Sequence, residues 1–462
     1  MTVFFRLSIA SAEPLPKRTT DVVTDANLVT DSDVETDADV DKPATTLPGE
    51  AHGIAKREEQ PGRLWLWPLR VALFVPRLAL EIMDAPIRGA LWAYEGYDIG
   101  PRSRQIFFNE DGTIGMYPVA FTETGFGLNV GLRFVHRELF GKDEKLNLRA
   151  SFGGRYRQLY RAKISSGERW PFEVVVKSEL EIRPKDAYFG VGHSFDAVRS
   201  RFSQTVSRSL VSTNIQLAKN LSLEVGGAYT YRKFNTTVAV DDGVRVLEAY
   251  PDDALVGIDE GISALSSLTR LSFDTRRSVS QYESAATPSL GWLMSGFVSS
   301  VRGVDSKPSD YIRVGADIQT YQRLAEGPRV LVLRANYSQV IGDREDIPFT
   351  DLPRLGGAIL GRGFHLDRFR DKASLLLSGE YQFDFSHLAL AALFVDYGRV
   401  AARASDLVTE IDDYAVGGGM ALQFHTAKSF IVRATLAGSQ EGLFFNMSFD
   451  PQFGPTSILE QN

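Results

Sequence analysis

Hydrophobicity alternates with a period of two along most of this chain, from about residue 104 to residue 450. In one segment, Leu128 and Val130 alternate with Asn129 and Arg133. Successive side chains of a β-strand point to opposite faces, so this pattern predicts strands with one apolar and one polar face. The same alternation recurs in the ranges 126–134, 146–156, 172–183, 375–385 and 414–425.

The length and charge of these segments favour a membrane barrel over a soluble sandwich. Soluble strands typically run about 5–6 residues, whereas about 9–11 residues cross a bilayer at a tilt. Many segments here reach the longer value, and their polar faces carry full charges such as Arg149, Lys177 and Glu179. An open sheet edge has no hydrogen-bond partner in hydrocarbon, so the sheet must close. We predict an all-β fold, a transmembrane antiparallel β-barrel of about 14 to 16 strands with a wet lumen.

Two segments at the start of the chain show no strand pattern. Residues 1–12 end in Ala10-Ser11-Ala12, which resembles the end of a secretory signal peptide, although Arg6 lies inside the apolar run. A signal-peptide remnant and a chance resemblance both stay open. Residues 13–62 are rich in Asp, Thr and Pro and lack the Gly and Glu spacing of a calcium loop. They predict a disordered acidic linker.

Residues 63–97 predict an amphipathic helix. Arg70, Arg77 and Asp84 lie seven residues apart, which collects charge on one stripe of an otherwise apolar segment. Charges interrupt the segment too often for a helix that spans a bilayer. We expect this helix to lie on the membrane surface or inside the barrel lumen.

The composition gives no sign of enzymatic chemistry. The chain has no cysteine, which excludes disulfides and thiolate metal sites. Residues 21–60 carry 11 acidic and 3 basic side chains, a net charge of -8, so the rest of the chain sums to +1. That balance gives no sign of nucleic-acid binding. The six histidines lack metal-ligand spacing, and the nucleophile-elbow and nucleotide-binding glycine motifs are missing. We expect no catalytic residues, no metal, no cofactor and no small-molecule substrate.

Two motifs near the C-terminal end carry a family resemblance. Leu355-Gly356-Gly357 and Arg362-Gly363-Phe364 precede a long alternating segment, and Phe394-Val395-Asp396-Tyr397-Gly398 follows it. Residues 98–453 resemble the barrel of the bacterial surface antigen superfamily, which includes BamA-like outer-membrane protein assembly factors and two-partner secretion transporters. Residues 454–462 form a C-terminal tail beyond it.

The resemblance implies a 16-stranded barrel in which an arginine loop turns inward. It pairs Arg362 with Asp396 on the inner wall. Glycines on both sides of the arginine allow positive φ, and the guanidinium fork can meet a carboxylate at two points. The alternative is that Arg362 is a solvated loop charge and Asp396 begins a turn. The candidate loop motif is Gly361, Arg362, Gly363 and Phe364, and the candidate strand motif is Phe394, Asp396 and Gly398.

This chain also departs from the family pattern. The segment before the strands is too short for the POTRA modules that usually precede the barrel, so we expect a short form without them. Gly361 stands where the family usually has an aliphatic residue.

The implied role is insertion of barrel proteins, or movement of protein or lipid, at the bacterial outer membrane. The family's route is a weakly paired seam between the first and last strands, here near 107–121 and 443–449. Expected partners are outer-membrane lipid and client barrel or secreted proteins, with no nucleic acid. A passive outer-membrane channel or structural barrel is the alternative function. A soluble β-rich enzyme or binding module is disfavoured.

Overall fold

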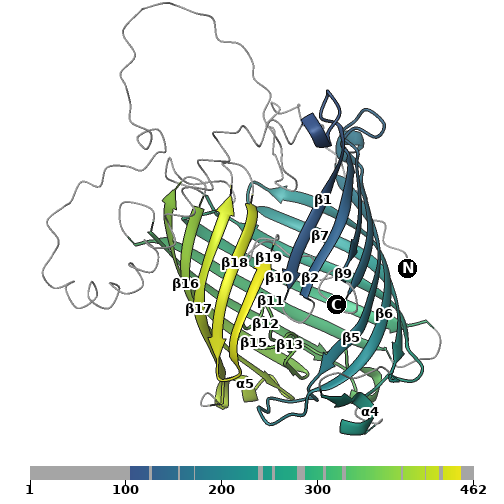
Figure 1. Cartoon of the computed structure of the whole chain (residues 1–462), viewed down its shortest axis with the longest axis vertical. Helices are drawn as coiled ribbons and strands as arrows, with labels where there is room; N and C mark the ends of the chain where they lie inside the picture. The colour runs from purple at the N-terminus through teal and green to yellow at the C-terminus, as the bar shows by residue number, and fades with distance from the viewer. Residues whose placement is uncertain are drawn as a thin grey trace, which may run out of the picture.

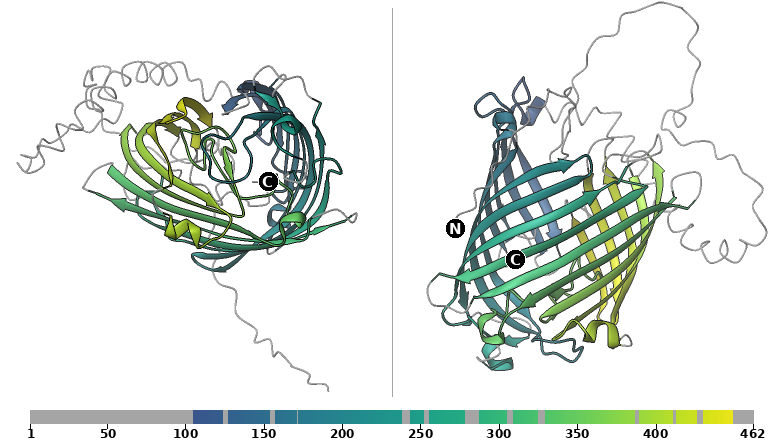
Figure 2. Two further views of the ribbon diagram at one scale, coloured as in Figure 1. Left: turned by 90° about the horizontal axis from the view of Figure 1, so that it is seen from below. Right: turned by 180° about the vertical axis from the view of Figure 1, so that it is seen from behind.

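The computed structural model describes residues 105–448, apart from 124–126, 154–156, 171, 238–242, 252–254, 278–286, 305–308, 325–328, 387–388, 411–412 and 426–429. In this part of the chain, a 17-stranded sheet curls into a barrel (Figure 1; Figure 2). All its strands except the two-residue β8 follow one another round the barrel. These are β1 (Ile114–Glu123), β2 (Gly127–His136), β3 (Lys145–Phe152), β4 (Gln158–Ser165), β5 (Glu173–Tyr188), β6 (Ser200–Ala218), β7 (Leu221–Asn235), β9 (Ile262–Asp274), β10 (Gly291–Gly303), β11 (Tyr311–Arg323), β12 (Arg329–Ile341), β15 (Ala373–Ser386), β16 (Ala389–Ala401), β17 (Ala415–His425), β18 (Phe430–Ser439) and β19 (Gly442–Ser448).

Short elements lie in the connections between these strands. β8 pairs in parallel with the start of β6, and β13 and β14 form a separate two-stranded sheet. None of the helices in the described ranges is long and apolar enough to cross a bilayer. The short elements are η2 (Gly167–Arg169), β8 (Val244–Arg245), α4 (Val246–Ala249), η4 (Arg344–Asp346), β13 (Arg354–Leu355), β14 (Phe369–Arg370) and α5 (Asp406–Thr409).

The ring of strands has one weak junction. β1 pairs with β2 through ten residue pairs, and β18 pairs with β19 through seven. By contrast, β1 and β19 are joined in the described residues by one pair, Thr122 with Met447. We call this junction the seam.

The register places the two faces of each strand as the alternation predicts. Leu128 and Val130 are 67% and 52% exposed, whereas Asn129 between them is fully buried. Large apolar side chains therefore cover the outside, and the polar set of each strand faces the lumen. The predicted all-β barrel and its two-faced strands are confirmed.

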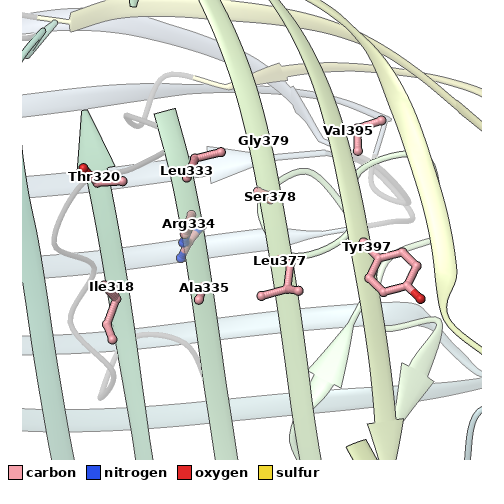
Figure 3. Close-up of a pocket in the computed structure, with 10 residues that line it drawn as sticks. All are labelled: Ile318, Thr320, Leu333, Arg334, Ala335, Leu377, Ser378, Gly379, Val395 and Tyr397. Carbon is pink, nitrogen blue, oxygen red and sulfur yellow. The ribbon is translucent and has the colours of Figure 1, made fainter. Parts of the chain in front are cut away.

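The outer face has a shallow hollow over β11, β12, β15 and β16, with a cavity volume of about 400 Å³. Gly379 and Ala335 leave space between the larger Leu333, Leu377 and Val395 (Figure 3). Small residues stand among bulky ones there, so the hollow is a shallow gap in the outer surface of the barrel.

The first barrel strand starts later in the chain than the alternation predicts. The first strand begins at Ile114 and not near residue 107. Residues 109–113 form a turn, in which the Asn109 side chain accepts a hydrogen bond from the Ile114 N–H and Gly112 has a φ of 68°. Turn chemistry of Asn and Gly therefore overrides the alternation there. The predicted segments 1–12, 13–62, 63–97 and 454–462 lie outside the described residues.

The short helices α4 and α5 lie at the same end of the barrel (Figure 1). An apolar cluster fills this end: Tyr188 and Phe202 from the strand ends pack with Leu255 and with Ile347 and Phe349 from the β12–β15 connection. Connections that bury side chains in this way are fixed to the barrel wall, which is what a precise lumenal site requires.

Candidate functional site

The β12–β15 connection folds back into the barrel as a hairpin. β13 and β14 form its base, where Arg354 pairs with Arg370 and Leu355 with Phe369. An ion pair of 2.9 Å between Arg354 Nη1 and Asp367 Oδ2 closes the base from the side. Arg362 is at the tip. We call residues 354–370 the lumenal hairpin.

The tip arginine is fully buried against β16. Its Nε and Nη2 lie 2.8 and 2.7 Å from Oδ2 and Oδ1 of Asp396, a two-point contact. The backbone N–H of Arg362 donates to the same carboxylate at 2.9 Å. Arg362 and Asp396 are 0% and 1% exposed. The structure therefore brings together the pair that the family resemblance predicts, and the alternative of a solvated loop charge is wrong.

A second carboxylate, which the sequence analysis did not single out, completes the site. Nη1 of Arg362 lies 2.7 Å from Oε2 of Glu380 on β15. The same oxygen lies 2.8 Å from Nη2 of Arg433 on β18, and Gln382 donates to the other Glu380 oxygen at 2.9 Å. Two arginines and two carboxylates thus form a buried network of zero net charge. We call Arg362, Glu380, Asp396 and Arg433 the tip network.

Neighbouring side chains hold the tip network in place. The Ser378 hydroxyl donates to Oδ1 of Asp396 at 2.6 Å. The guanidinium carbon of Arg362 lies 3.5 Å from the ring centroid of Phe394, a cation–π contact. Strand parity puts Phe394 and Asp396 on the same face, so one strand supplies both the ring and the carboxylate. Ser378 and Glu380 share the polar face of their strand, which is the signal that could have found them.

Glycines allow the hairpin tip to reach the wall. Gly361 and Gly363 have φ values of 95° and 97°, a region that side chains rarely adopt. On the opposite side, a Cβ added to Gly417 of β17 would lie 2.0 Å from the Arg362 carbonyl oxygen. At Gly398 of the strand motif, an added Cβ would lie 3.0 Å from Leu355. Both wall glycines therefore make room for the hairpin.

The flank of the hairpin contacts two other connections. Arg368 donates to the Ser194 and Phe195 carbonyls at 3.0 and 2.8 Å. It also forms an ion pair with Glu441 in the β18–β19 turn. Phe364 of the predicted motif is buried and packs edge-on against Phe369, with ring centroids 5.4 Å apart. The hairpin therefore ties the β5–β6 connection to the strands next to the seam.

The arrangement suits a structural brace more than a reaction centre. Every charge of the tip network is matched by an opposite charge in direct contact, and each oxygen of both carboxylates accepts at least one hydrogen bond. Within the described residues, no group of three His, Asp or Glu side chains could hold a metal ion. The functional role of these residues stays a prediction.

Comparisons with known proteins indicate the family to which this chain belongs. Residues 138–437 match the Omp85 superfamily domain. Among solved structures, BamA from Haemophilus ducreyi lacking POTRA domains 1–3 is similar at a TM-score of 0.52 and 13% identity, covering 73% of this chain and 70% of that chain. CdiB from Acinetobacter baumannii has a TM-score of 0.45 and 12% identity, covering 72% and 59%. CdiB from Escherichia coli has 0.46 and 10%, covering 72% and 62%.

At such low identity, the likeness to BamA shows the fold alone. A search of curated protein sequences found no significant match. The family match is the stronger finding, because it covers well over half of the sequence and includes both predicted motifs. This chain therefore belongs to the Omp85 superfamily.

Proposed function

We propose that this protein is an integral barrel of the bacterial outer membrane, which inserts barrel proteins into that membrane or moves protein or lipid across it. It does so without enzymatic chemistry. Membership of the Omp85 superfamily supports outer-membrane protein insertion or translocation in general. The observation that supports an active role for this chain is the seam, where the described residues of β1 and β19 form one residue pair and those of β1 and β2 form ten.

A weak seam gives the barrel a means of handling a client strand. Among the described residues, the edge of β1 has few backbone partners on the β19 side, and such an edge is a template for another strand. Pro118 within β1 has no N–H to donate, which weakens pairing locally. In the part of the barrel that the structure describes, opening at this junction would break one residue pair, whereas opening between β1 and β2 would break ten.

The tip network lies next to this junction. Three of its residues come from β15, β16 and β18, and the fourth, Arg362, is the tip of the lumenal hairpin, which Gly417 of β17 contacts. The hairpin therefore keeps the C-terminal strands aligned while the seam opens. In this mechanism Arg362 and Asp396 hold the shape of the barrel and do not touch the client.

A disulfide lock tests the proposal. The chain has no cysteine, so Thr122→Cys with Met447→Cys places one bridge across the seam. The control is Thr122→Cys with Leu128→Cys, because Thr122 faces Leu128 in the β1–β2 ladder. Each variant is reconstituted in liposomes, and the folding rate of an added client barrel is read from its heat-modifiable gel mobility. We expect the oxidised seam lock to abolish stimulation, reduction to restore it, and the control to stay active when oxidised. Equal activity of both oxidised variants would refute the seam mechanism.

A further inference from the structure

The shallow hollow on the outer face of the barrel has a regular construction. Two neighbouring rows of side chains cross the strands there. Leu333, Gly379 and Val395 form one row across β12, β15 and β16, and Ala335, Leu377 and Tyr397 form the next. Ala335 and Gly379 are diagonal neighbours, so the lowest part of the surface runs obliquely between the two leucines (Figure 3). We call this space the outer hollow.

The walls of the outer hollow are apolar. Leu333, Leu377 and Val395 are 46%, 41% and 52% exposed. Arg334 and Ser378 also line the hollow, but their polar groups contact carboxylates on the lumenal side. Apolar space of this kind binds water poorly, and its walls lack dispersion contacts as long as it stays empty. The ligand chemistry that fits these walls is therefore a hydrocarbon chain.

Gly379 is a glycine that the fold itself does not require. Its backbone is not left-handed, and it pairs with Leu333 and Val395 without a bulge. An added Cβ would have Leu333 as its nearest described neighbour, at 3.8 Å, whereas a Cβ on Gly419 would lie 2.1 Å from the Leu436 carbonyl oxygen. Glycine weakens a strand, and it is found there at bulges, at bends and where a ligand or another backbone comes close. Of these reasons, the close approach of a ligand is the one that suits Gly379.

One end of the outer hollow carries a polar group. Thr320 pairs with Leu333 at this end, and its hydroxyl accepts a hydrogen bond of 2.8 Å from the Gln322 side-chain amide. Gln322 is the last residue but one of β11, so the polar end lies near the end of a strand. A carboxamide NH₂ has two donors, and the second can meet an ester oxygen. An apolar space that begins at such a donor matches the ester group and chain of a phospholipid.

We propose that the outer hollow binds one acyl chain of a membrane phospholipid. The inference rests on the proposed function in one respect, which is that the barrel lies in a membrane. Barrel strands tilt by about 35–45°, so a row of side chains across them also rises along the barrel axis, as an acyl chain does through a leaflet. The hollow has a volume of about 400 Å³, within the range of roughly 300–1,000 Å³ that is usual for small-ligand sites.

The position of the outer hollow gives the bound chain a structural consequence. Gly379 precedes Glu380 on β15, and Val395 precedes Asp396 on β16. Successive residues of a strand face opposite sides, so the outer hollow lies directly behind the two carboxylates that hold Arg362. A bound acyl chain would therefore support from outside the same part of the wall that the lumenal hairpin contacts from within.

Native mass spectrometry of the full chain tests this site. The protein is mixed in detergent micelles with palmitoyl-oleoyl phosphatidylglycerol, and bound lipids are counted while the collision energy rises. We expect one phospholipid to stay on the wild type after all others have left. Gly379→Leu fills the outer hollow, and the fraction of protein that keeps this lipid should fall about tenfold, as for the loss of roughly two buried methylene contacts.

The matched control is Gly296→Leu. Gly296 is an exposed glycine within β10, where an added Cβ would have the Gly315 carbonyl oxygen as its nearest described neighbour, at 3.9 Å, and it does not line the outer hollow. This variant should keep the phospholipid like the wild type. Equal retention by wild type and Gly379→Leu, or equal loss in the two variants, overturns the proposal. If Gly379→Leu does not gain heat-modifiable mobility on gels, Ala335→Leu takes its place under the same criteria.

Two further measurements separate the possible reasons for a failure. Dihexanoyl phosphatidylglycerol has the same headgroup without a long chain, so displacement of the retained lipid by it would show headgroup recognition and would also overturn the proposal. Carbonate extraction of membranes tests whether the barrel lies in a membrane at all. A protein that is released would refute the proposed function as a whole, whereas a protein that stays in the membrane but keeps no phospholipid would refute only the acyl-chain site.

Discussion

At the residue scale, the tip network depends on each of its charges. Arg362 and Asp396 are buried, and each makes several charge-assisted contacts. Removing one partner of such a pair leaves the other charge buried without compensation, which costs about 3–5 kcal/mol. We expect Arg362→Ala and Asp396→Ala each to lower the unfolding free energy by about that amount, less any hydration of the lumen.

The measurement is urea-dependent loss of heat-modifiable mobility on gels. The double variant should cost clearly less than the sum of the single changes, because the second removal takes away a charge that is already unmatched. Arg362→Lys keeps the charge but loses the two-point contact, and it should fall between wild type and Arg362→Ala. If the losses in unfolding free energy of the two single variants simply add in the double variant, Arg362 and Asp396 do not stabilise the protein as a pair.

The second carboxylate permits a test of charge balance. Glu380→Gln leaves Arg362 and Arg433 facing one carboxylate, so the network gains a net positive charge. We expect a loss of about 3–5 kcal/mol in unfolding free energy. Adding Arg433→Gln restores neutrality and should recover part of the loss in the same urea titration. A double variant less stable than Glu380→Gln alone would show that packing and not charge sets the cost.

At the scale of elements, the sequence predicts a strand correctly where the alternation of apolar and polar residues is the only local signal. Alternation predicts the strand faces correctly, because a strand between lipid and lumen has two fixed environments. It fails at residues 109–113, where Asn109 and Gly112 favour a turn. Strand parity also puts Glu380 in the lumen, yet it cannot show that β15, β16 and β18 converge on one guanidinium. That convergence depends on register across strands and on the depth that the lumenal hairpin reaches.

Two wall glycines offer a test at the same scale. A Cβ at Gly417 would lie 2.0 Å from the Arg362 carbonyl oxygen, whereas a Cβ at Gly379 on the outer face has Leu333 as its nearest neighbour at 3.8 Å. We expect Gly417→Ala to displace the hairpin tip and to cost about 1–3 kcal/mol through overpacking. Gly379→Ala should change the unfolding free energy little. Trypsin sensitivity at Arg362 should rise for Gly417→Ala alone, and equal behaviour of the two variants would contradict this placement of the hairpin.

At the scale of the whole molecule, the lumenal hairpin joins parts of the barrel that the sheet alone connects only the long way round. Arg362 holds β15 and β16, and Arg368 holds both the β5–β6 connection and the β18–β19 turn. A barrel with a weak seam needs such cross-links, because its ring of hydrogen bonds does not by itself fix the positions of the end strands.

The alternative function, a passive channel, predicts a different conductance from a barrel that the lumenal hairpin closes. If the lumenal hairpin closes the lumen, it blocks ion flow, and the barrel should show small and rare conductance in planar bilayers. A passive pore should instead show a large and steady conductance. We expect wild type to conduct rarely and Arg362→Ala to open more often, because its hairpin has lost the contacts to Asp396 and Glu380. Arg334→Ala, which removes a lumenal charge outside the hairpin, is the control and should leave opening frequency near that of wild type. A wild-type protein that conducts steadily, with Arg362→Ala changing only the size of the current, would favour the pore and would leave the seam without a role in transport.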